Sequence, residues 1–220
     1  MTSFLNPTYI IAVLIAISVH EWAHAFVASR FGDPTPGQNG RLTLNPIAHL
    51  DLLGAIMFLV IGFGWAKPVP VDSRYFRHPK RDLSLVALAG PFSNLVLAFI
   101  SFLLLLLVTH GNGFSLGSLL SNPTGPSPAW TILIQILNAS LFVNLALMAF
   151  NLFPVAPLDG SNIVRQFIPY QYEERYEDFV RIGPYILIGL IVAEMFLPIH
   201  ILSAWVFGIM QFVLNIFNLI

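Results

Sequence analysis

The chain has 220 residues, of which 56% are hydrophobic and only 10% are charged, and its formal net charge is −1. An average soluble domain carries about 25% charged residues, so this composition excludes a water-exposed surface of ordinary polarity. The absence of cysteine excludes disulfides, a cysteine nucleophile and a cysteine-based metal site. Residues 1–20 and 83–158 contain no Asp, Glu, Lys or Arg. Because a membrane-spanning helix needs about 20 apolar residues, we expect an all-α polytopic membrane protein.

Apolar segments follow one another along the chain, at 8–31, 52–64, 83–109, 129–153, 182–198 and 199–220. The first lacks a basic leader region and runs directly into polar residues, so we expect a span rather than a cleaved signal peptide. The second is too short for an ordinary span and contains Gly54, Gly62 and Gly64, which favours a re-entrant element. The sequence therefore predicts about five transmembrane helices plus one re-entrant element. The last two helices, within residues 182–220, should form a hairpin that turns at Pro198.

The basic residues indicate how the chain is oriented in the membrane. If the second segment enters the membrane and returns, all Lys and Arg residues fall at or beside one face: Arg30, Arg41, Lys67, Arg74, Arg77, Lys80, Arg81, Arg165, Arg175 and Arg181. Loop 110–128, which would lie at the other face, has no charged residue. Cytoplasmic loops are enriched in Lys and Arg. We therefore expect a multi-pass protein of the cell membrane whose N-terminus is outside.

Two short stretches outside the apolar segments have the alternation of strands. These are residues 41–44 and 69–71, the second limited to a sheet edge by Pro70. Backbone at membrane depth must be paired internally or buried in protein. We therefore expect a small β-sheet near the cytoplasmic face, joined to the re-entrant element.

The sequence HEWAH at residues 20–24 lies on the first predicted helix and matches the pattern H-E-x-x-H. His20 and His24 are four residues apart and share a helix face, so both imidazoles can bind one Zn²⁺. Glu21 could reach a water on that ion and take its proton. Ionisable residues inside a membrane are costly and usually functional. The alternative is a structural pair of histidines with Glu21 as their counter-ion.

Catalytic zinc needs a third protein ligand and an open position, and few residues can supply the ligand. Asp159 ends the long uncharged stretch, where Pro154 and Pro157 break the helix and Gly160 permits a turn. An aspartate on unwound backbone at this depth suits a metal ligand. It equally suits a helix cap at the membrane surface, so both interpretations stay open on the residues alone.

Together these motifs make the chain resemble the site-2 protease family of intramembrane zinc metalloproteases. The resemblance rests on His20-Glu21-x-x-His24 in the first span and on Asn151-x-x-Pro154-x-x-x-Leu158-Asp159-Gly160 after the fourth. Stretches 40–51, 64–71 and 89–94 support it, although Leu52 stands where the family pattern has proline. The chain looks like the small bacterial members without PDZ or CBS domains. The resemblance implies one Zn²⁺ per chain on His20, His24 and Asp159, with Glu21 as catalytic base.

The resemblance also bears on domain organisation and on the remaining polar residues. We expect a single membrane-embedded metalloprotease domain over 1–220, with a catalytic core at about 8–165. Asn151 belongs to the second motif, and its amide could donate to a substrate oxyanion or form an interhelical hydrogen bond. His49 and Asp51 are expected mainly to fix their loop. Gly90, Pro91 and Asn94 are expected to allow close helix packing.

The predicted function is an intramembrane zinc endopeptidase that cleaves transmembrane segments near the cytoplasmic side. Its expected partners are a transmembrane-helix protein substrate and the lipid bilayer, with no nucleic acid, and the oligomeric state stays open. The first alternative is a metal transporter that uses the same His and Asp residues along a path. The second is an inactive scaffold that binds transmembrane helices, which the presence of Glu21 argues against.

Overall fold

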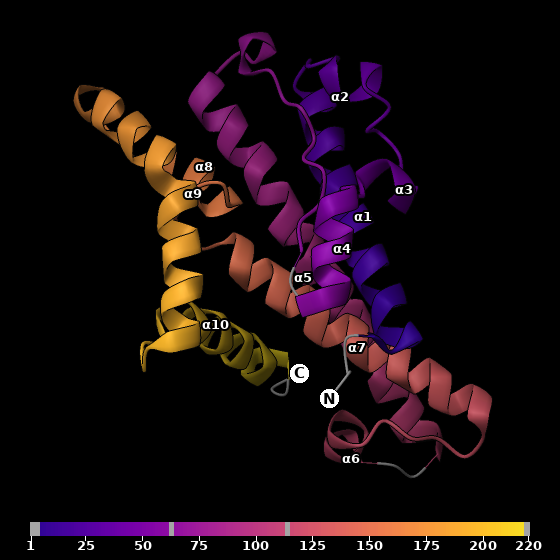
Figure 1. Ribbon diagram of the computed structural model, residues 1–220. Coiled ribbons are helices and arrows are strands. Elements are labelled where there is room, and N and C mark those ends of the chain that lie inside the picture. Colours follow the sequence, from indigo (N-terminus) through magenta and orange to yellow (C-terminus); the bar gives the residue numbers. More distant parts are fainter. Residues whose placement is uncertain (1–4, 62–63, 113–114, 218–220) are drawn as a thin grey trace.

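The structure is a computed structural model that describes residues 5–61, 64–112 and 115–217 (Figure 1). Three long helices pack against one another and form its body: α1 (Pro7–Arg30), α5 (Pro79–Asn112) and α7 (Pro128–Asn151). Proline at the first turn of α1 and of α7 suits the helix start, because the missing N–H would have no partner there. The Asn6 side chain accepts a hydrogen bond from the Thr8 N–H and caps α1.

The largest apolar core lies between α5, α7 and the last helix, α10 (Ile201–Phe217). Phe217 contacts Phe99 and Phe102 of α5, with ring centroids 5.2 and 5.1 Å apart. The buried residues of this core are Ala98, Phe102, Leu105, Val108, Leu119, Ile134, Leu141, Leu145, Met148, Val213 and Phe217. α10 is therefore part of the main bundle.

α9 (Glu173–Phe196) stands to one side of the body and joins α10 through a short turn (Figure 1). The turn lies where Pro198 predicts it. The hairpin is open, however, because α10 leans away to pack on α7, where the Trp205 indole N–H donates to the Ala149 carbonyl over 2.9 Å. Glu194 near the end of α9 accepts hydrogen bonds from the Leu202 and Ser203 N–H groups. This carboxylate thus fixes the start of α10.

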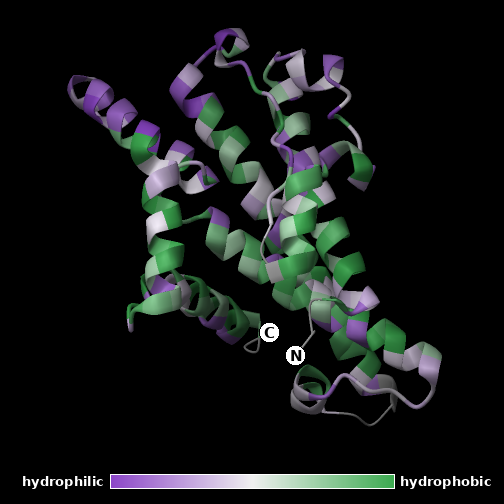
Figure 2. Ribbon diagram, in the orientation of Figure 1, coloured by the Kyte–Doolittle hydropathy of each residue, from purple (hydrophilic) through white to green (hydrophobic). Residues whose placement is uncertain are grey.

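The long apolar helices agree with an all-α polytopic membrane protein. Four described helices are long and apolar enough to cross a membrane: α1, α5, α7 and the segment containing α9. Figure 2 shows apolar residues through the middle of the molecule and polar residues gathered at the end that holds α2 (Thr35–Gln38) and the start of α5. The predicted count of five spans is not supported, since α10 has only 17 residues. The α9 helix also begins earlier than expected, at Glu173.

The short apolar segment expected at 52–64 contains α4 (Leu52–Ile61). The residues that follow this segment lie beside the residues that precede it. Leu50 and Ala66 form an antiparallel bridge, and the Lys67 N–H donates to the His49 carbonyl over 2.8 Å. Gly54 lies against the Trp65 backbone so closely that a Cβ there would overlap it. The two flanks of the segment therefore lie side by side at one level.

The predicted small β-sheet is wrong for the residues that the structure describes, where the bridge between Leu50 and Ala66 is isolated. Residues 41–44 and 69–71 form no strand. The physical reason is that side chains bond to the backbone of both stretches: His49 Nε2 lies 2.8 Å from the Thr43 carbonyl oxygen, and the Val69 N–H donates to Glu21 Oε2. Side chains thus take backbone groups that a sheet ladder would have used. The remaining short elements are α2 (Thr35–Gln38), α3 (Pro46–His49), η2 (Ser73–Tyr75), α6 (Leu116–Ser121), α8 (Asp159–Arg165) and η3 (Tyr170–Tyr172).

α9 is held to the body at two places near its polar end. Glu173 pairs with Lys80 of α5 and with Arg165 of α8, the second pair at 2.8 Å. Gly183 lies against Ala156 in the turn after α7, where an added Cβ would come within 2.8 Å of the Ala156 carbonyl oxygen. Only glycine allows this approach. α9 is thereby fixed against the turn that leads into Asp159.

Candidate metal centre

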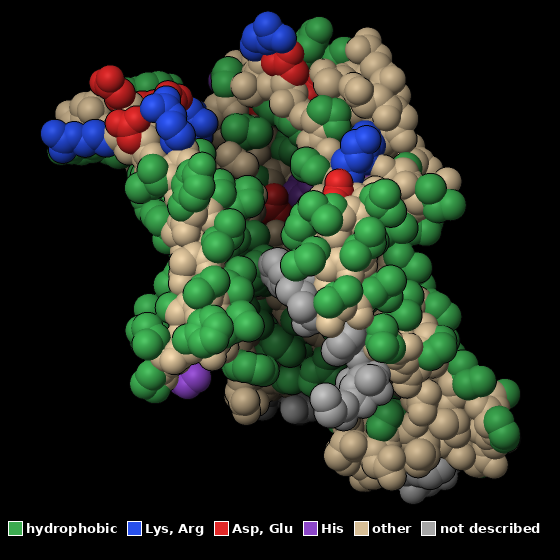
Figure 3. Space-filling view, in the orientation of Figure 1, with side chains coloured by type: hydrophobic (Ala, Val, Ile, Leu, Met, Phe, Trp, Pro, Cys, Tyr) green, Lys and Arg blue, Asp and Glu red, His purple; other side chains and the backbone are tan. Residues whose placement is uncertain are grey.

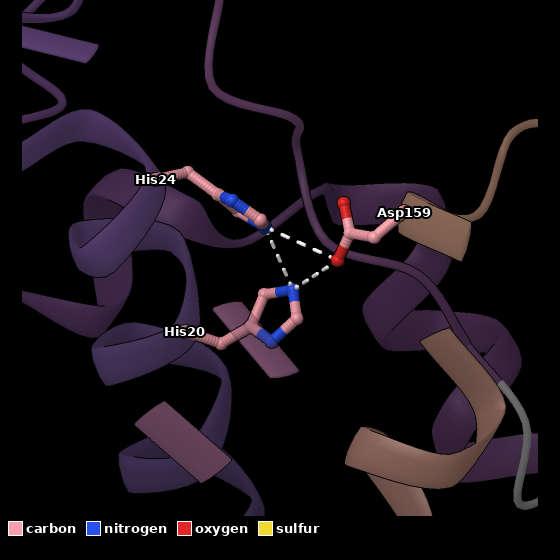
Figure 4. A group of neighbouring side chains, drawn as sticks. All are labelled: His20, His24 and Asp159. Carbon is pink, nitrogen blue, oxygen red and sulfur yellow. Dashed lines mark hydrogen bonds and ion pairs between the residues drawn. The ribbon is translucent and has the colours of Figure 1, made fainter. Parts of the chain in front are cut away.

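Two segments far apart in the sequence bring three potential metal ligands together (Figure 4). His20 and His24 project from one face of α1, and Asp159 begins α8 just after the turn that follows α7. The two imidazole Nε2 atoms are 3.0 Å apart. Asp159 Oδ2 lies 3.2 Å from the His20 Nε2 and 3.3 Å from the His24 Nε2. Among the described residues these form the one group of three or more His and acidic side chains that could hold a metal ion.

The polar atoms of this group fit a bound cation. The Asp159 Oδ2 is buried and has no hydrogen-bond partner, although both imidazoles are close to it. His20 and His24 are only 7% and 8% exposed. A buried carboxylate oxygen without a partner is costly, and a cation between the three atoms would remove that cost. Two imidazole nitrogens and a carboxylate oxygen are also a ligand set that zinc takes in catalytic sites.

The other nitrogen of each imidazole is engaged by α5. His20 Nδ1 lies 2.7 Å from the Asn94 Oδ1, and His24 Nδ1 lies 2.7 Å from the Val86 carbonyl oxygen. Both partners are acceptors, so each Nδ1 carries the hydrogen and donates it. Each Nε2 is then left with a lone pair directed at the group. Metal-binding histidines are typically oriented in this way.

A glycine allows α5 to come this close to the two histidines. Val86, Gly90 and Asn94 are four residues apart and share the face of α5 that meets α1. A Cβ at Gly90 would lie 2.6 Å from the Cε1 atom of each imidazole. Any side chain at this position would therefore displace the histidines.

The group lies in a cleft of about 750 Å³ lined by parts of α1, α5, α7, α8, α9 and the loop after α4. Figure 3 shows this hollow between α9 and α4, with acidic and histidine side chains at its floor and hydrophobic side chains on its walls. Glu21 lines the cleft, and its Oε2 accepts a hydrogen bond of 3.3 Å from the Val69 N–H. The sequence-predicted base therefore faces the same space as the potential ligands.

The remaining sequence candidates occupy different positions. Asn151 lines the cleft, but its amide N–H donates to the Leu147 carbonyl of its own helix over 3.0 Å. His49 is fully buried in its loop, where its Nε2 lies 2.8 Å from the Thr43 carbonyl oxygen. Asp51 accepts from the Gly54 N–H at the start of α4. Neither His49 nor Asp51 belongs to the group of potential ligands.

Sequence reasoning missed the contact between Asn94 and His20. Asn94 was expected only to help helices pack closely. A signal was available, because Asn94 is a polar residue inside a long uncharged helix, four positions after a glycine. The sequence does not reveal which side chain on another helix its amide faces.

The comparison with known families bears directly on this site. A model of Peptidase family M50 matches residues 8–194, which include all three potential ligands and Glu21. The chain belongs to peptidase family M50. This is the site-2 protease family, so the resemblance inferred from the two motifs is confirmed.

Relatives of this M50 chain have names that agree with the family. It is 47% identical to the "putative zinc metalloprotease YwhC" of Bacillus subtilis, over 75% of this chain and 71% of the relative. It is 30% identical to Rip2 of Mycobacterium tuberculosis, over 92% of this chain and 71% of the relative. It is 29% identical to MJ0611 of Methanocaldococcus jannaschii, over 74% and 75%. The last two have names of the same form. No solved structure matches the chain significantly.

The tight fit at Gly90 gives a test of the M50 site. Gly90→Ala should displace both imidazoles and reduce the metal content of the purified protein, at a cost of about 1–3 kcal/mol in stability. Gly208→Ala in α10 is the control, because a Cβ there meets nothing within 4 Å. The measurements are elemental analysis and thermal unfolding in detergent. Full metal content and an unchanged melting temperature in Gly90→Ala would contradict the fit described here.

Proposed function

We propose that this chain is a zinc-dependent intramembrane endopeptidase, with one Zn²⁺ held by His20, His24 and Asp159. The observation that carries the proposal is the convergence of two Nε2 atoms and one buried, unpartnered carboxylate oxygen in a cleft. The M50 match and the names of the relatives support zinc as the metal and peptide hydrolysis as the reaction.

The residues of the cleft have distinct roles in this proposal. Zinc supplies a Lewis acid that polarises a peptide carbonyl and lowers the pKa of water. Glu21 takes a proton from the attacking water and passes it to the leaving amine. The hydrogen bond from the Val69 N–H keeps the Glu21 carboxylate turned into the cleft. Asn151 also lines the cleft, and its amide has a second N–H, besides the one given to the Leu147 carbonyl, that can donate to the substrate oxygen that gains negative charge.

The substrate in this proposal is a transmembrane segment of another protein. The cleft walls are largely apolar, and include Leu147, Phe150, Leu187, Ile188 and Ile191. A substrate helix must unwind before its carbonyls can be attacked, because its backbone groups are hydrogen-bonded to each other. The loop at 66–71 borders the cleft and could pair with the unwound segment as an added strand.

The proposed topology places the cleft towards the cytoplasmic side of the cell membrane. The two flanks of α4 meet at one level, which supports a re-entrant element rather than a crossing. α10 then makes the fifth crossing, since its 17 residues are at the lower limit for a spanning helix. In this arrangement the N-terminus is outside, and residues 1–220 form a single domain whose catalytic core is about 8–165.

The two rival functions fit the site less well. A metal transporter needs several ligand groups along a path, whereas the residues that the structure describes hold one such group, at one depth. An inactive scaffold has no use for an acidic side chain beside the ligands, and Glu21 faces the same cleft as they do.

The role of Glu21 can be tested without disturbing the metal. Glu21→Gln should lower cleavage of a single-span substrate about 10²–10⁴-fold while zinc content stays at the native level, because the amide cannot accept a proton. Glu174→Gln, at an exposed position of α9, is the matched control. Cleavage within about tenfold of the native rate would remove Glu21 from the mechanism.

Asp159 and Asn151 should respond differently to substitution. Asp159→Asn should lose zinc and activity together, because an amide oxygen is a poorer ligand than a carboxylate. Asn151→Ala should keep zinc and lose mainly activity. Zinc occupancy and cleavage rate are measured for each folded variant. Normal zinc and turnover in Asp159→Asn would place the third ligand elsewhere.

The topology can be tested by cysteine labelling, since the chain has no native cysteine. A single Cys at Ser115 should react with a membrane-impermeant maleimide added to intact cells, whereas one at Arg77 should react only after the cells are opened. The opposite pattern would reverse the proposed orientation.

A further inference from the structure

Behind His20 lies a chain of buried amide side chains that joins three helices. Asn94 of α5 accepts from His20 Nδ1 over 2.7 Å and donates from its amide nitrogen to Asn144 Oδ1 of α7 over 2.8 Å. Asn144 donates to the carbonyl and the hydroxyl oxygen of Ser140 over 2.8 and 3.2 Å. Asn94 and Asn144 are both 0% exposed. All of these bonds lie on the side of His20 that is turned away from Asp159.

The chain of bonds has a defined direction. The amide nitrogen of Asn94 donates to the Ala16 carbonyl as well as to Asn144, so its oxygen must be the atom that faces His20. Asn144 is oriented in the same way, because its amide nitrogen is used on Ser140. A reversed Asn94 would turn its amide oxygen towards the Ala16 carbonyl oxygen, and because both are acceptors the Asn94 oxygen would be left unpaired there. Such unpaired groups are costly in a buried site.

The orientation of the Asn94 amide determines which imidazole nitrogen of His20 carries the hydrogen and which has its lone pair available to a metal ion. With an acceptor at Nδ1, the hydrogen of a neutral imidazole lies on Nδ1, and Nε2 has its lone pair available. With a donor at Nδ1, the hydrogen would move to Nε2, which faces His24 and Asp159. His24 obtains its acceptor from the Val86 backbone carbonyl, which no side-chain substitution removes.

We infer that Asn94 is a positioning residue of the metal centre that holds His20 in its ligating tautomer and ring orientation, and that Asn144 orients Asn94. This inference rests on the proposed zinc site. It assigns to α7 a contribution to the metal centre, which is distinct from the role proposed for Asn151 towards the substrate.

The test compares substitutions that keep or remove the acceptor at His20. Asn94→Ala removes it, and Asn94→Asp keeps it while losing both donated bonds. Asn144→Ala leaves Asn94 in place but removes one of its two acceptors. Asn138→Ala is the matched control, because Asn138 is a partly buried amide on the same α7 that donates to the Leu119 and Leu120 carbonyls and does not reach His20.

Zinc affinity of each purified, full-length variant is measured by competition with a chromogenic chelator. Binding of Co²⁺ is followed in parallel by its absorption spectrum, which reports the ligand set without any catalysis. We expect Asn94→Ala to bind zinc about 10–100-fold more weakly and to change the Co²⁺ spectrum. Asn94→Asp should stay within a few-fold of the native affinity, Asn144→Ala should lose a few-fold, and Asn138→Ala should be unchanged.

A role in packing alone gives the opposite order for the two Asn94 variants. Asp would place a carboxylate oxygen against the Ala16 carbonyl oxygen and Asn144 Oδ1, which are both acceptors, and would bury a charge, so it would be the more damaging substitution. Equal zinc affinity in Asn94→Ala and the native protein, or weaker binding by Asn94→Asp than by Asn94→Ala, would overturn the inference. If Asn94→Ala does not fold, zinc affinity within a few-fold of native and a native Co²⁺ spectrum in Asn94→Asp support the inference, and a loss of more than about tenfold in Asn94→Asp overturns it.

The same assay separates this inference from the proposed function. The doubly substituted His20→Ala, His24→Ala protein should bind no zinc at the chelator concentrations used. If it binds zinc like the native protein, the proposed metal centre is wrong. If it loses zinc while Asn94→Ala keeps native affinity, the metal centre stands and only the role of Asn94 fails.

Discussion

The close approach of α1 and α5 at Gly90 is the contact on which the site depends. Without a Cβ at that position, the two imidazoles of α1 lie directly against the backbone of α5. That distance lets Val86 and Asn94 accept from both Nδ1 atoms, which directs both Nε2 atoms towards Asp159. The absence of a side chain at Gly90 thereby determines the position and the hydrogen bonds of His20 and His24, two of the three potential ligands.

A second close approach positions the third potential ligand. A Cβ at Gly160 would come within 2.7 Å of the Leu152 carbonyl carbon, so the start of α8 lies directly on the end of α7. Asp159 is therefore a helix-initiating residue and a neighbour of both histidines at once. Of the two interpretations that the residues alone left open, the helix cap is not borne out, because Leu158 precedes α8 and no side chain caps the helix, whereas the Asp159 carboxylate meets both imidazoles.

The motifs predicted the potential ligands because their spacing has a direct meaning on a helix or at a helix start. His20, His24 and Asp159 meet as expected, and the long spans lie close to their apolar segments. The sheet could not be predicted correctly, since the His49 and Glu21 side chains take backbone groups of the two expected strands. The role of Asn94 was equally hidden, because it depends on which end of an amide faces α1. The open arrangement of α9 and α10 depends on packing against α7, which segment lengths do not encode.

The separation of the ligands along the chain has a consequence for biosynthesis. His20 and His24 emerge from the ribosome with α1, whereas Asp159 follows only after α5 and α7. A nascent chain that has inserted its first helices therefore has two imidazoles and no carboxylate to complete the group. Assembly of the centre has to wait until α7 is in place and α8 can dock beside it. Proteolytic capacity is thus tied to completion of the bundle, and a chain arrested before residue 159 is a membrane protein without a hydrolytic centre.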